Sequence, residues 1–425
     1  MKNILILGAG TGGTILANTL TRKLSMKEWA ITVIDKSAEH YYQPGFLFLP
    51  FRLYGYNSKS DVVHPAAKHI PSAARFVNAE VKLIDHQNRR VETTGGNFDY
   101  DWLILAMGCD VRPGEVEGLS EGMGKNVFTF YTMEGALALQ DRLETMKEGR
   151  LVLNIADMPI KCPVAPIEFV FLADYYFHKK GIRDKVEIDL VTPLTGAFTK
   201  PVASHALGKI AEEKNIKIVP NFAISEVDHN AKTISSYGGG KVDYDLLVAI
   251  APNLGPEVIE DSGLGNGVGY AVTDDKTLKV KKAERIYAIG DNTNVPTSKA
   301  GSVAHFEAEI VEANLLREIE GKEPIADFDG HSNCFIESGF HKALLFDFNY
   351  DTEPLPGTFP IPGVGPMSLL KETRLNHWGK MAFKYIYWTM LLSGHMPGDP
   401  LLPSHMSYSG KDLSQLKHHK EEGKH

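Results

Sequence analysis

Two parts of this chain repeat the same order of segments, and this repeat constrains the fold more than any single motif. Residues 75–86 are matched by residues 217–229, and residues 98–106 by residues 242–250, with offsets of 142 to 144 residues. Each copy reads as strand, helix and strand, followed by a hairpin and a final apolar strand. We therefore predict an α/β fold with two tandem Rossmann-like domains, each a parallel sheet carrying a small antiparallel layer.

The repeat also suggests where the chain divides. An apolar strand at residues 284–291 and a helix expected over residues 302–316 return the chain to the first domain. Residues 354–366 are rich in Pro and Gly and read as an irregular connector. We expect a discontinuous first domain of residues 1–112 and 253–328, a second domain of residues 113–252, and a C-terminal segment of residues 329–425 with a disordered tail from about residue 411.

Composition excludes several classes of protein. A formal net charge of −8 argues against a nucleic-acid partner. The three cysteines, Cys109, Cys162 and Cys334, have neither zinc-finger nor C-x-x-C spacing, so we expect no disulfide framework and no metal site. The apolar run after Lys2 meets Gly8 before a signal peptide is complete, so we expect none. No stretch reaches the roughly 18–20 apolar residues of a membrane-spanning helix.

The first copy begins with a glycine-rich turn. The apolar strand of residues 3–7 runs into a G-x-G-x-x-G sequence at residues 8–13. Such glycines give a tight turn, let a pyrophosphate approach the backbone, and bring the next helix N-terminus to the phosphates. An acid ends the second strand, where a ribose hydroxyl needs an acceptor. We therefore predict a dinucleotide bound by Gly8, Gly10, Gly12, Gly13, Asp35 and Lys36.

The identity of the dinucleotide follows from Gly290 and Asp291, which end a later strand. A carboxylate there can accept hydrogen bonds from the ribityl chain of a flavin, and NAD has no such chain. Gly108, at the end of the hairpin region, fits the same layout. Lys299 can stabilise negative charge on a reduced flavin or a quinone, although an ordinary surface lysine is the alternative. We expect FAD in the first domain.

The second copy lacks the glycine turn. Residues 156–163 read ADMPIKCP, and the two prolines remove amide donors that a phosphate would need. Thr192 stands where an acid would be expected after the second strand. We therefore expect that this domain has lost NAD(P)H binding. Cys162 stands near the missing glycines, and a nearby helix N-terminus or a cation such as Lys161 would favour its thiolate.

The C-terminal segment has a different character. A segment beginning near Leu369 has helical spacing that places its basic residues on one stripe and its aromatic residues on the rest. This pattern is typical of a helix in a membrane interface, with cations toward anionic lipid, and the alternative is a helix packed on the protein's own sheet. The basic stripe consists of Arg374, His377, Lys380 and Lys384.

Several segments together resemble the sulfide:quinone oxidoreductases, and the resemblance covers about residues 1–410. They are the glycine turn, residues 41–45 (YYQPG), residues 161–168 (KCPVAPIE), Gly290 with Asp291, residues 299–301 (KAG) and residues 375–380 (LNHWGK). The cysteine near the missing second glycine turn is the specific part of the pattern.

This resemblance implies that Cys162 and Cys334 form a redox pair beside FAD. Hydrosulfide would attack their disulfide or polysulfide bridge by thiol–disulfide exchange, leaving a persulfide and a thiolate. Two electrons would pass through FAD to a quinone, and sulfur would leave as polysulfide or zero-valent sulfur. We choose Cys334 as the thiolate that faces the flavin, with Cys162 as the alternative. The residues expected on the quinone and membrane side are Lys299, Phe383, Tyr385 and Trp388.

The resemblance further implies a peripheral, monotopic protein of the cell membrane, without indicating which side of the membrane it occupies. We also expect a homo-oligomer. Residues 128–132 hold neither the third cysteine nor the histidine that several family members carry there. Gln43 does not match the cysteine that tethers FAD in flavocytochrome c sulfide dehydrogenases. We therefore expect two-cysteine chemistry and noncovalent FAD, with Cys109 as a small buried side chain.

Three alternative functions remain open beside this interpretation. A flavocytochrome c-type sulfide dehydrogenase would be exported, and we expect no export signal. A type II NADH:quinone reductase is disfavoured by the lost second nucleotide site. A noncatalytic flavoprotein that senses redox state and docks on membranes is the alternative from a different class.

Overall fold

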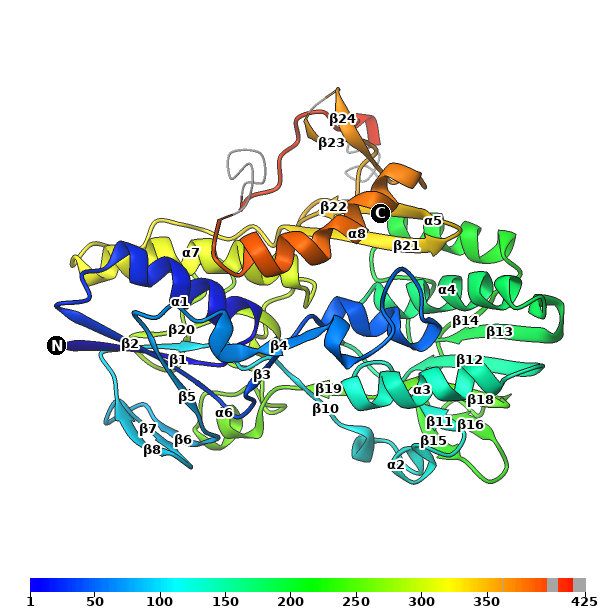
Figure 1. Ribbon diagram of the computed structural model, residues 1–425, viewed down its shortest axis with the longest axis horizontal. Helices are drawn as coiled ribbons and strands as arrows, with labels where there is room; N and C mark the ends of the chain where they lie inside the picture. The colour runs from blue at the N-terminus through cyan, green and yellow to red at the C-terminus, as the bar shows by residue number, and fades with distance from the viewer. Residues whose placement is uncertain (362, 396–403, 416–425) are drawn as a thin grey trace.

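The computed structural model describes residues 1–361, 363–395 and 404–415. Two α/β lobes lie side by side, and the C-terminal segment crosses above both in the view of Figure 1. The largest group of buried apolar side chains includes Ile4 from the first lobe, Leu153 from the second and Phe346 from the C-terminal segment. The three parts therefore share one core.

The first lobe is built on a five-stranded parallel sheet with the order β20-β9-β1-β2-β5. Its strands are β1 (Lys2–Leu7), β2 (Trp29–Asp35), β5 (Arg75–Asn78), β9 (Trp102–Leu105) and β20 (Ile286–Ala288). In Figure 1, α1 (Thr11–Lys23) and α7 (Gly301–Ile319) lie above this sheet. Because β20 pairs with β9, the chain returns to the first sheet after building the second, as the sequence predicts.

The second lobe repeats this arrangement with the order β11-β18-β12-β13-β14. Its strands are β11 (Val127–Phe128), β12 (Gly149–Ile155), β13 (Val186–Val191), β14 (Lys217–Val219) and β18 (Leu246–Ile250). Thus β12 corresponds to β1 and α4 (Ala165–Lys179) to α1. The predicted pair of Rossmann-like sheets is confirmed, while the domain boundaries stay predictions.

Each lobe also carries the predicted antiparallel layer of three strands. These are β6 (Val81–Asp85), β7 (Arg90–Thr93) and β8 (Gly96–Asp99) in the first lobe, and β15 (Ile224–Asp228), β16 (Thr233–Ser236) and β17 (Lys241–Asp243) in the second. The remaining regular elements are β3 (Glu39–Tyr41), β4 (Val63–Pro65), β10 (Asp110–Val111), β19 (Asn253–Leu254), α2 (Leu119–Gly122), α3 (Met133–Thr145), α5 (Pro201–Glu213) and α6 (Glu257–Asp261). Short 3-10 turns connect several of them.

The C-terminal segment begins with the hairpin of β21 (Ser332–Gly339) and β22 (Lys342–Phe348). A second hairpin, β23 (Gly357–Ile361) with β24 (Gly365–Leu369), stands where an irregular connector was expected. Both strands of this hairpin are edge strands. Proline is tolerated in an edge strand because its missing amide donor can face away from the partner strand.

The last helix, α8 (Arg374–Ile386), lies within the segment predicted to begin near Leu369 and continues into a π-helical turn, Tyr387–Leu391. No helix in the described part of the chain is long and apolar enough to cross a membrane. In the tail, the side chain of Lys411 is buried and its ammonium lies 2.5 Å from Asp347 Oδ2. The tail therefore differs from the expected disorder at residue 411, while residues 416–425 lie outside the described range.

Candidate active site

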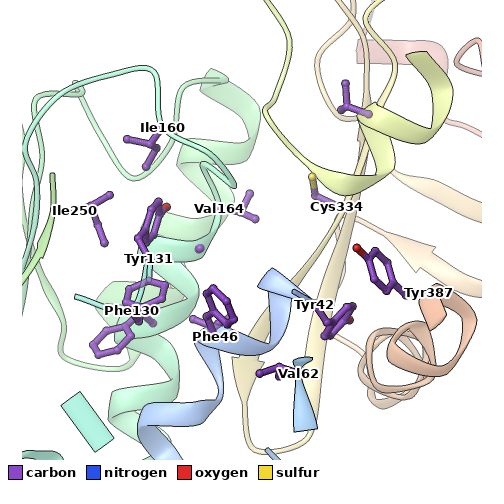
Figure 2. Close-up of a cluster of buried hydrophobic side chains, with 14 of the residues drawn as sticks. Tyr42, Phe46, Val62, Phe130, Tyr131, Ile160, Val164, Ile250, Cys334 and Tyr387 are labelled. Carbon is purple, nitrogen blue, oxygen red and sulfur yellow. The ribbon is translucent and has the colours of Figure 1, made fainter. Parts of the chain in front are cut away.

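A cavity of about 470 Å³ lies where the two lobes meet the C-terminal segment. Figure 2 shows several of its wall residues, among them Phe46, Val164, Cys334 and Tyr387. Among the residues predicted from sequence, those that line it are Gly10, Gly12, Asp35, Lys36, Gly108, Cys162, Gly290, Asp291, Lys299, Cys334 and Phe383. Residues from the whole length of the chain therefore meet around one space.

The glycine turn is packed so closely that side chains are excluded from two of its positions. Gly8 has φ +108°, and a Cβ there would lie 2.2 Å from the Ala106 carbonyl oxygen. A Cβ on Gly13 would lie 1.9 Å from the Gly8 oxygen. Gly10, in contrast, has no neighbour within 4 Å of an added Cβ and lines the cavity. The turn therefore keeps open space at the N-terminus of α1, where the free amides can meet phosphate.

The acid at the end of β2 holds this turn in place. Asp35 accepts hydrogen bonds from the Ala9 amide through Oδ2 and the Ser37 amide through Oδ1, each at 2.7 Å. Burial raises the pKa of Asp35, and the Ala9 bond acts in the opposite direction. The exposed Lys36 ammonium lies 3.8 Å from Asp110. A carboxylate on the cavity wall with lone pairs to spare suits a ribose hydroxyl.

The flavin end of the predicted site is formed by Gly290, Asp291 and Lys299. Burial raises the pKa of Asp291, and the Lys299 charge acts in the opposite direction. The Lys299 ammonium donates to the Asp291 carbonyl at 3.0 Å and the Thr293 carbonyl at 2.7 Å. Lys299 is 7% exposed, so the alternative of a surface lysine is wrong.

One polar atom beside this region also favours a ligand. The Asn333 side-chain nitrogen is buried and has no hydrogen-bond partner within the described residues, yet Asn333 lines the cavity. A buried donor without a partner is costly. Together with the open glycine turn and the Asp35 and Asp291 carboxylates, this donor fits a polar dinucleotide such as FAD.

The two predicted cysteines reach the cavity from different parts of the chain. Cys162 lies in the turn before α4 with φ +48°, and its amide donates to the Lys299 carbonyl at 2.6 Å. Cys334 lies in β21 and is 8% exposed. Both are free thiols and both line the cavity. Cys109 lines it too, with Sγ 3.8 Å from Asn253 Oδ1.

The environment of the thiols differs from expectation. Burial raises the pKa of Cys162, and the charge of Glu168 raises it further. Lys380 and the Ala165 amide, at the start of α4, lower it. The predicted cation Lys161 instead donates to Gln43 Oε1 at 2.9 Å. The helix N-terminus thus acts as predicted, but the cation comes from α8.

The orientation of α8 reverses the predicted one. His377 and Lys380 are buried and bound to acids, whereas the predicted basic stripe was expected to face lipid. The exposed face instead carries Leu375, Trp378 and Tyr385, which are 46%, 63% and 71% exposed. Pairing with buried carboxylates thus holds His377 and Lys380 inside, whereas Arg374 stays exposed and Lys384 is half-buried.

Of the residues assigned to the quinone and membrane side, only Phe383 and Lys299 reach the cavity. Tyr385 points to solvent. Trp388 stacks on the His64 ring with centroids 3.9 Å apart. The π-helical turn places its neighbour Tyr387 on the cavity wall instead.

Known proteins are similar to this chain over most of its length. A model of the pyridine nucleotide-disulphide oxidoreductases matches residues 2–152. Mitochondrial sulfide:quinone oxidoreductases from Mus musculus and Dictyostelium discoideum are 26% and 29% identical, each over 94% of this chain and 88% and 87% of their own length. The crystal structure of the sulfide:quinone oxidoreductase from Aquifex aeolicus has the same fold, with a TM-score of 0.77, 21% identity and 94% of each chain covered. The chain belongs to the sulfide:quinone oxidoreductase family of two-dinucleotide-binding-domain flavoproteins.

A related group is also similar. A type II NADH:quinone oxidoreductase from Staphylococcus aureus is 32% identical over 81% of this chain and 90% of its own length. In this sulfide:quinone oxidoreductase family member, Thr192 is buried after β13, and its Oγ1 accepts from the Leu194 amide at 3.2 Å. The second lobe therefore has a buried, hydrogen-bonded hydroxyl at the position where the first lobe has the Asp35 carboxylate.

Sequence reasoning missed several side chains on the cavity wall of this family member. They are His40, Tyr131, Glu168, Asn333, Lys380 and Tyr387. His40 Nδ1 lies 2.8 Å from the Ala9 carbonyl, which can only accept, so Nδ1 carries the proton and Tyr387 donates to Nε2 at 2.7 Å. Glu168 and His40 lie in or beside the quoted family segments, which was the available signal. No sequence signal pointed to Asn333.

Proposed function

We propose that this protein oxidises sulfide at a Cys162–Cys334 pair and passes two electrons through FAD to a quinone. One observation carries the proposal. Both thiols, the open glycine turn and Asp291 at the end of its strand line the same cavity. When bound there, FAD would accept two electrons and release them to a second substrate. The homologous enzymes named above act on sulfide and quinone.

The two thiols divide the sulfur chemistry between them. When they are joined in a disulfide, hydrosulfide attacks one sulfur, forms a new S–S bond and expels the other as thiolate. Burial raises the pKa of Cys334 to about 11, with a hydrogen bond from Ser332 opposing the shift, whereas the pKa of Cys162 is raised further. Because the more acidic thiol leaves faster, this favours attack at Cys162 and release of Cys334, the residue that we propose faces the flavin.

The second lobe supports a role without a nicotinamide. The loop after β12 holds Cys162 where the first lobe has its glycines, and Thr192 is closed to a ribose. We propose that electrons enter from sulfide alone. Binding of FAD is proposed to be noncovalent, since Gln43 occupies the position expected of a tether and its side chain accepts from Lys161.

The quinone is proposed to enter beside Phe383 and Tyr387, which join the cavity to the C-terminal segment. The exposed face of α8 and the β23–β24 hairpin would lie in the membrane interface. Their exposed apolar side chains are Ile361, Val364, Leu375, Trp378 and Tyr385. Aromatic and aliphatic side chains on one face suit this depth of a bilayer.

Anaerobic addition of sulfide to the purified flavoprotein tests the proposal. We expect rapid bleaching of the flavin absorbance, and its return when a soluble quinone analogue is added. NADH should leave the absorbance unchanged. Bleaching by NADH would instead favour a type II NADH:quinone reductase. Binding of sulfide without turnover would favour a sensor.

A further inference from the structure

Two ion pairs are buried side by side beneath α8. Lys380 binds Glu168, and the two residues are 9% and 1% exposed. One helical turn earlier, His377 Nδ1 lies 2.9 Å from Glu337 Oε2, and these residues are 1% and 0% exposed. Burying four ionisable groups costs free energy that well-packed apolar side chains would not cost. The sulfur chemistry proposed above uses neither pair.

The inner pair faces the thiols. Glu168 and Lys380 line the cavity together with Cys162 and Cys334. The charge of Glu168 raises the pKa of both cysteines, and the charge of Lys380 lowers it. Burial also raises the pKa of Glu168 itself. A carboxyl in this position can take up a proton that is released at the sulfur atoms.

The outer pair is connected to the inner one. The Glu337 amide donates to Glu168 Oε1 at 2.6 Å, so the two acids are adjacent. His377 and Lys380 are three residues apart on α8, which places their Cβ atoms about 5–6 Å apart. One water molecule or one rotation of a long side chain spans that distance.

The outer pair in turn approaches the surface. The Tyr54 hydroxyl donates to Glu337 Oε1 at 3.1 Å. His341 is exposed in the turn between β21 and β22, and its ring centroid lies 5.2 Å from that of His377. The Tyr175 hydroxyl lies 3.3 Å from His341 Nε2. Ionisable side chains therefore follow one another from the cavity to solvent.

The proposed reaction requires such a connection. Attack of hydrosulfide on a disulfide gives a persulfide, RSSH, and a thiolate. The persulfide must lose its proton before the two sulfur groups can rejoin and give two electrons to FAD. The quinone then takes up two electrons and two protons, so each turnover releases one proton at the thiols and consumes two at the quinone, a net uptake of one.

We propose that the Glu168–Lys380 and Glu337–His377 pairs form a proton path between the thiol cavity and solvent, and that it opens at His341. The persulfide proton passes to Glu168, then to the Glu337–His377 pair, and leaves at His341. This path rests on the proposed function, because it carries the proton of that reaction. The titratable groups in direct contact with His377 are Glu337 on β21, Tyr54 in the loop after Phe51, and His341 in the turn after β21. Glu168 on α4 contacts Glu337, Tyr175 on α4 contacts His341, and Lys380 on α8 contacts Glu168.

The test uses the FAD-loaded protein with sulfide and a soluble quinone analogue. The rate of flavin reduction is followed by stopped-flow absorbance in weak and in strong buffer. We expect His377→Ala to slow this rate by about 100-fold, as for loss of a positioned proton-transfer group, and added imidazole to restore most of it. His341→Ala, at an exposed position, should slow the rate several-fold in weak buffer and recover in strong buffer.

A matched control is His331→Gln. His331 is also buried and bound to an acid, Asp347, at 2.6 Å in the same hairpin, but it does not line the cavity. We expect its rates to stay within twofold of the unaltered protein, without an imidazole effect. A second readout needs no FAD: Glu168→Gln should speed alkylation of Cys162 by iodoacetamide at pH 7, because it removes the charge that raises the thiol pKa.

The outcomes separate the two proposals. If sulfide does not bleach the unaltered protein, the proposed function fails. If the unaltered protein is bleached and both His341→Ala and His377→Ala match its rate of flavin reduction in weak buffer, the proton path alone is refuted. A loss in His377→Ala that imidazole does not restore, with FAD retained, assigns His377 a structural role and also refutes the path.

Discussion

The turn after β1 and the loop after β12 occupy equivalent places in the two lobes, yet they are built for different purposes. In the first lobe, Gly8 and Gly13 press against backbone atoms and leave open space at Gly10. In the second lobe, Cys162 takes up a positive φ before α4, and a thiol points into the cavity. The comparison teaches that the sheet topology can be kept while the connection after the first strand decides the chemistry.

The largest expected effect would come from removing the sulfur of the second loop. Cys162→Ser and Cys334→Ser should each slow sulfide-driven flavin reduction by about 10³-fold or more, because each thiol is needed for exchange. Stopped-flow absorbance after sulfide addition measures this, and FAD content shows that the first lobe is intact.

The control is Cys109→Ser. Cys109 also lines the cavity but has Asn253 rather than a second thiol beside it. We expect it to keep most of the activity. Fast reduction in Cys162→Ser would remove the difference between the two loops.

The next effect concerns the glycine turn. Gly13→Ala places a Cβ 1.9 Å from the Gly8 oxygen and should lower the free energy of unfolding by about 1–3 kcal/mol. Gly10→Ala meets no atom within 4 Å, so its apoprotein should stay within about 0.5 kcal/mol of the original while binding FAD about tenfold more weakly. Thermal unfolding of the apoprotein and FAD titration separate the two effects. Equal stability losses would show that Gly10 is not held open for a ligand.

A smaller effect depends on pH. The pKa of Cys334 is raised to about 11 by burial, so its thiol stays protonated below that value and ionises as the pH rises through it. At pH 8 iodoacetamide should alkylate Cys334 about tenfold more slowly than an exposed cysteine, and the rate should climb until about pH 11. Peptide mass spectrometry after timed quenching gives the rate, and a plateau near pH 8.5 would contradict the prediction.

The smallest expected effect is on membrane binding, and it shows which part of the molecule contacts lipid. Trp378 on α8 and Tyr237 on the second lobe are both highly exposed, at 63% and 82%. Trp378→Ala should weaken binding to phospholipid vesicles about fivefold, and Tyr237→Ala should leave it unchanged. Vesicle sedimentation compares them, and a reversed order would move the contact surface to the second lobe.

Local patterns made the two sheets and the glycine turn predictable. The turn at residues 8–13 needs only its own strand, helix and glycines, so a short window of sequence contains the whole argument. The internal repeat then supplied the second sheet without any motif. These features depend on residues that are close together in the chain.

The arrangement around α8 could not be predicted in the same way. Its basic residues suggested contact with anionic lipid, but Lys380 binds Glu168, which is 212 residues away in the sequence. No periodicity reports such a pairing, and burial of one partner decides the direction of the whole helix. The meeting of Cys162 with Cys334 in one cavity came from a family resemblance, since spacing alone cannot bring them together.

The bond from the Cys162 amide to the Lys299 carbonyl fastens one lobe to the other beside the cavity. Because this hydrogen bond joins two backbone atoms, it holds the loop that carries Cys162 at a fixed distance from the first lobe.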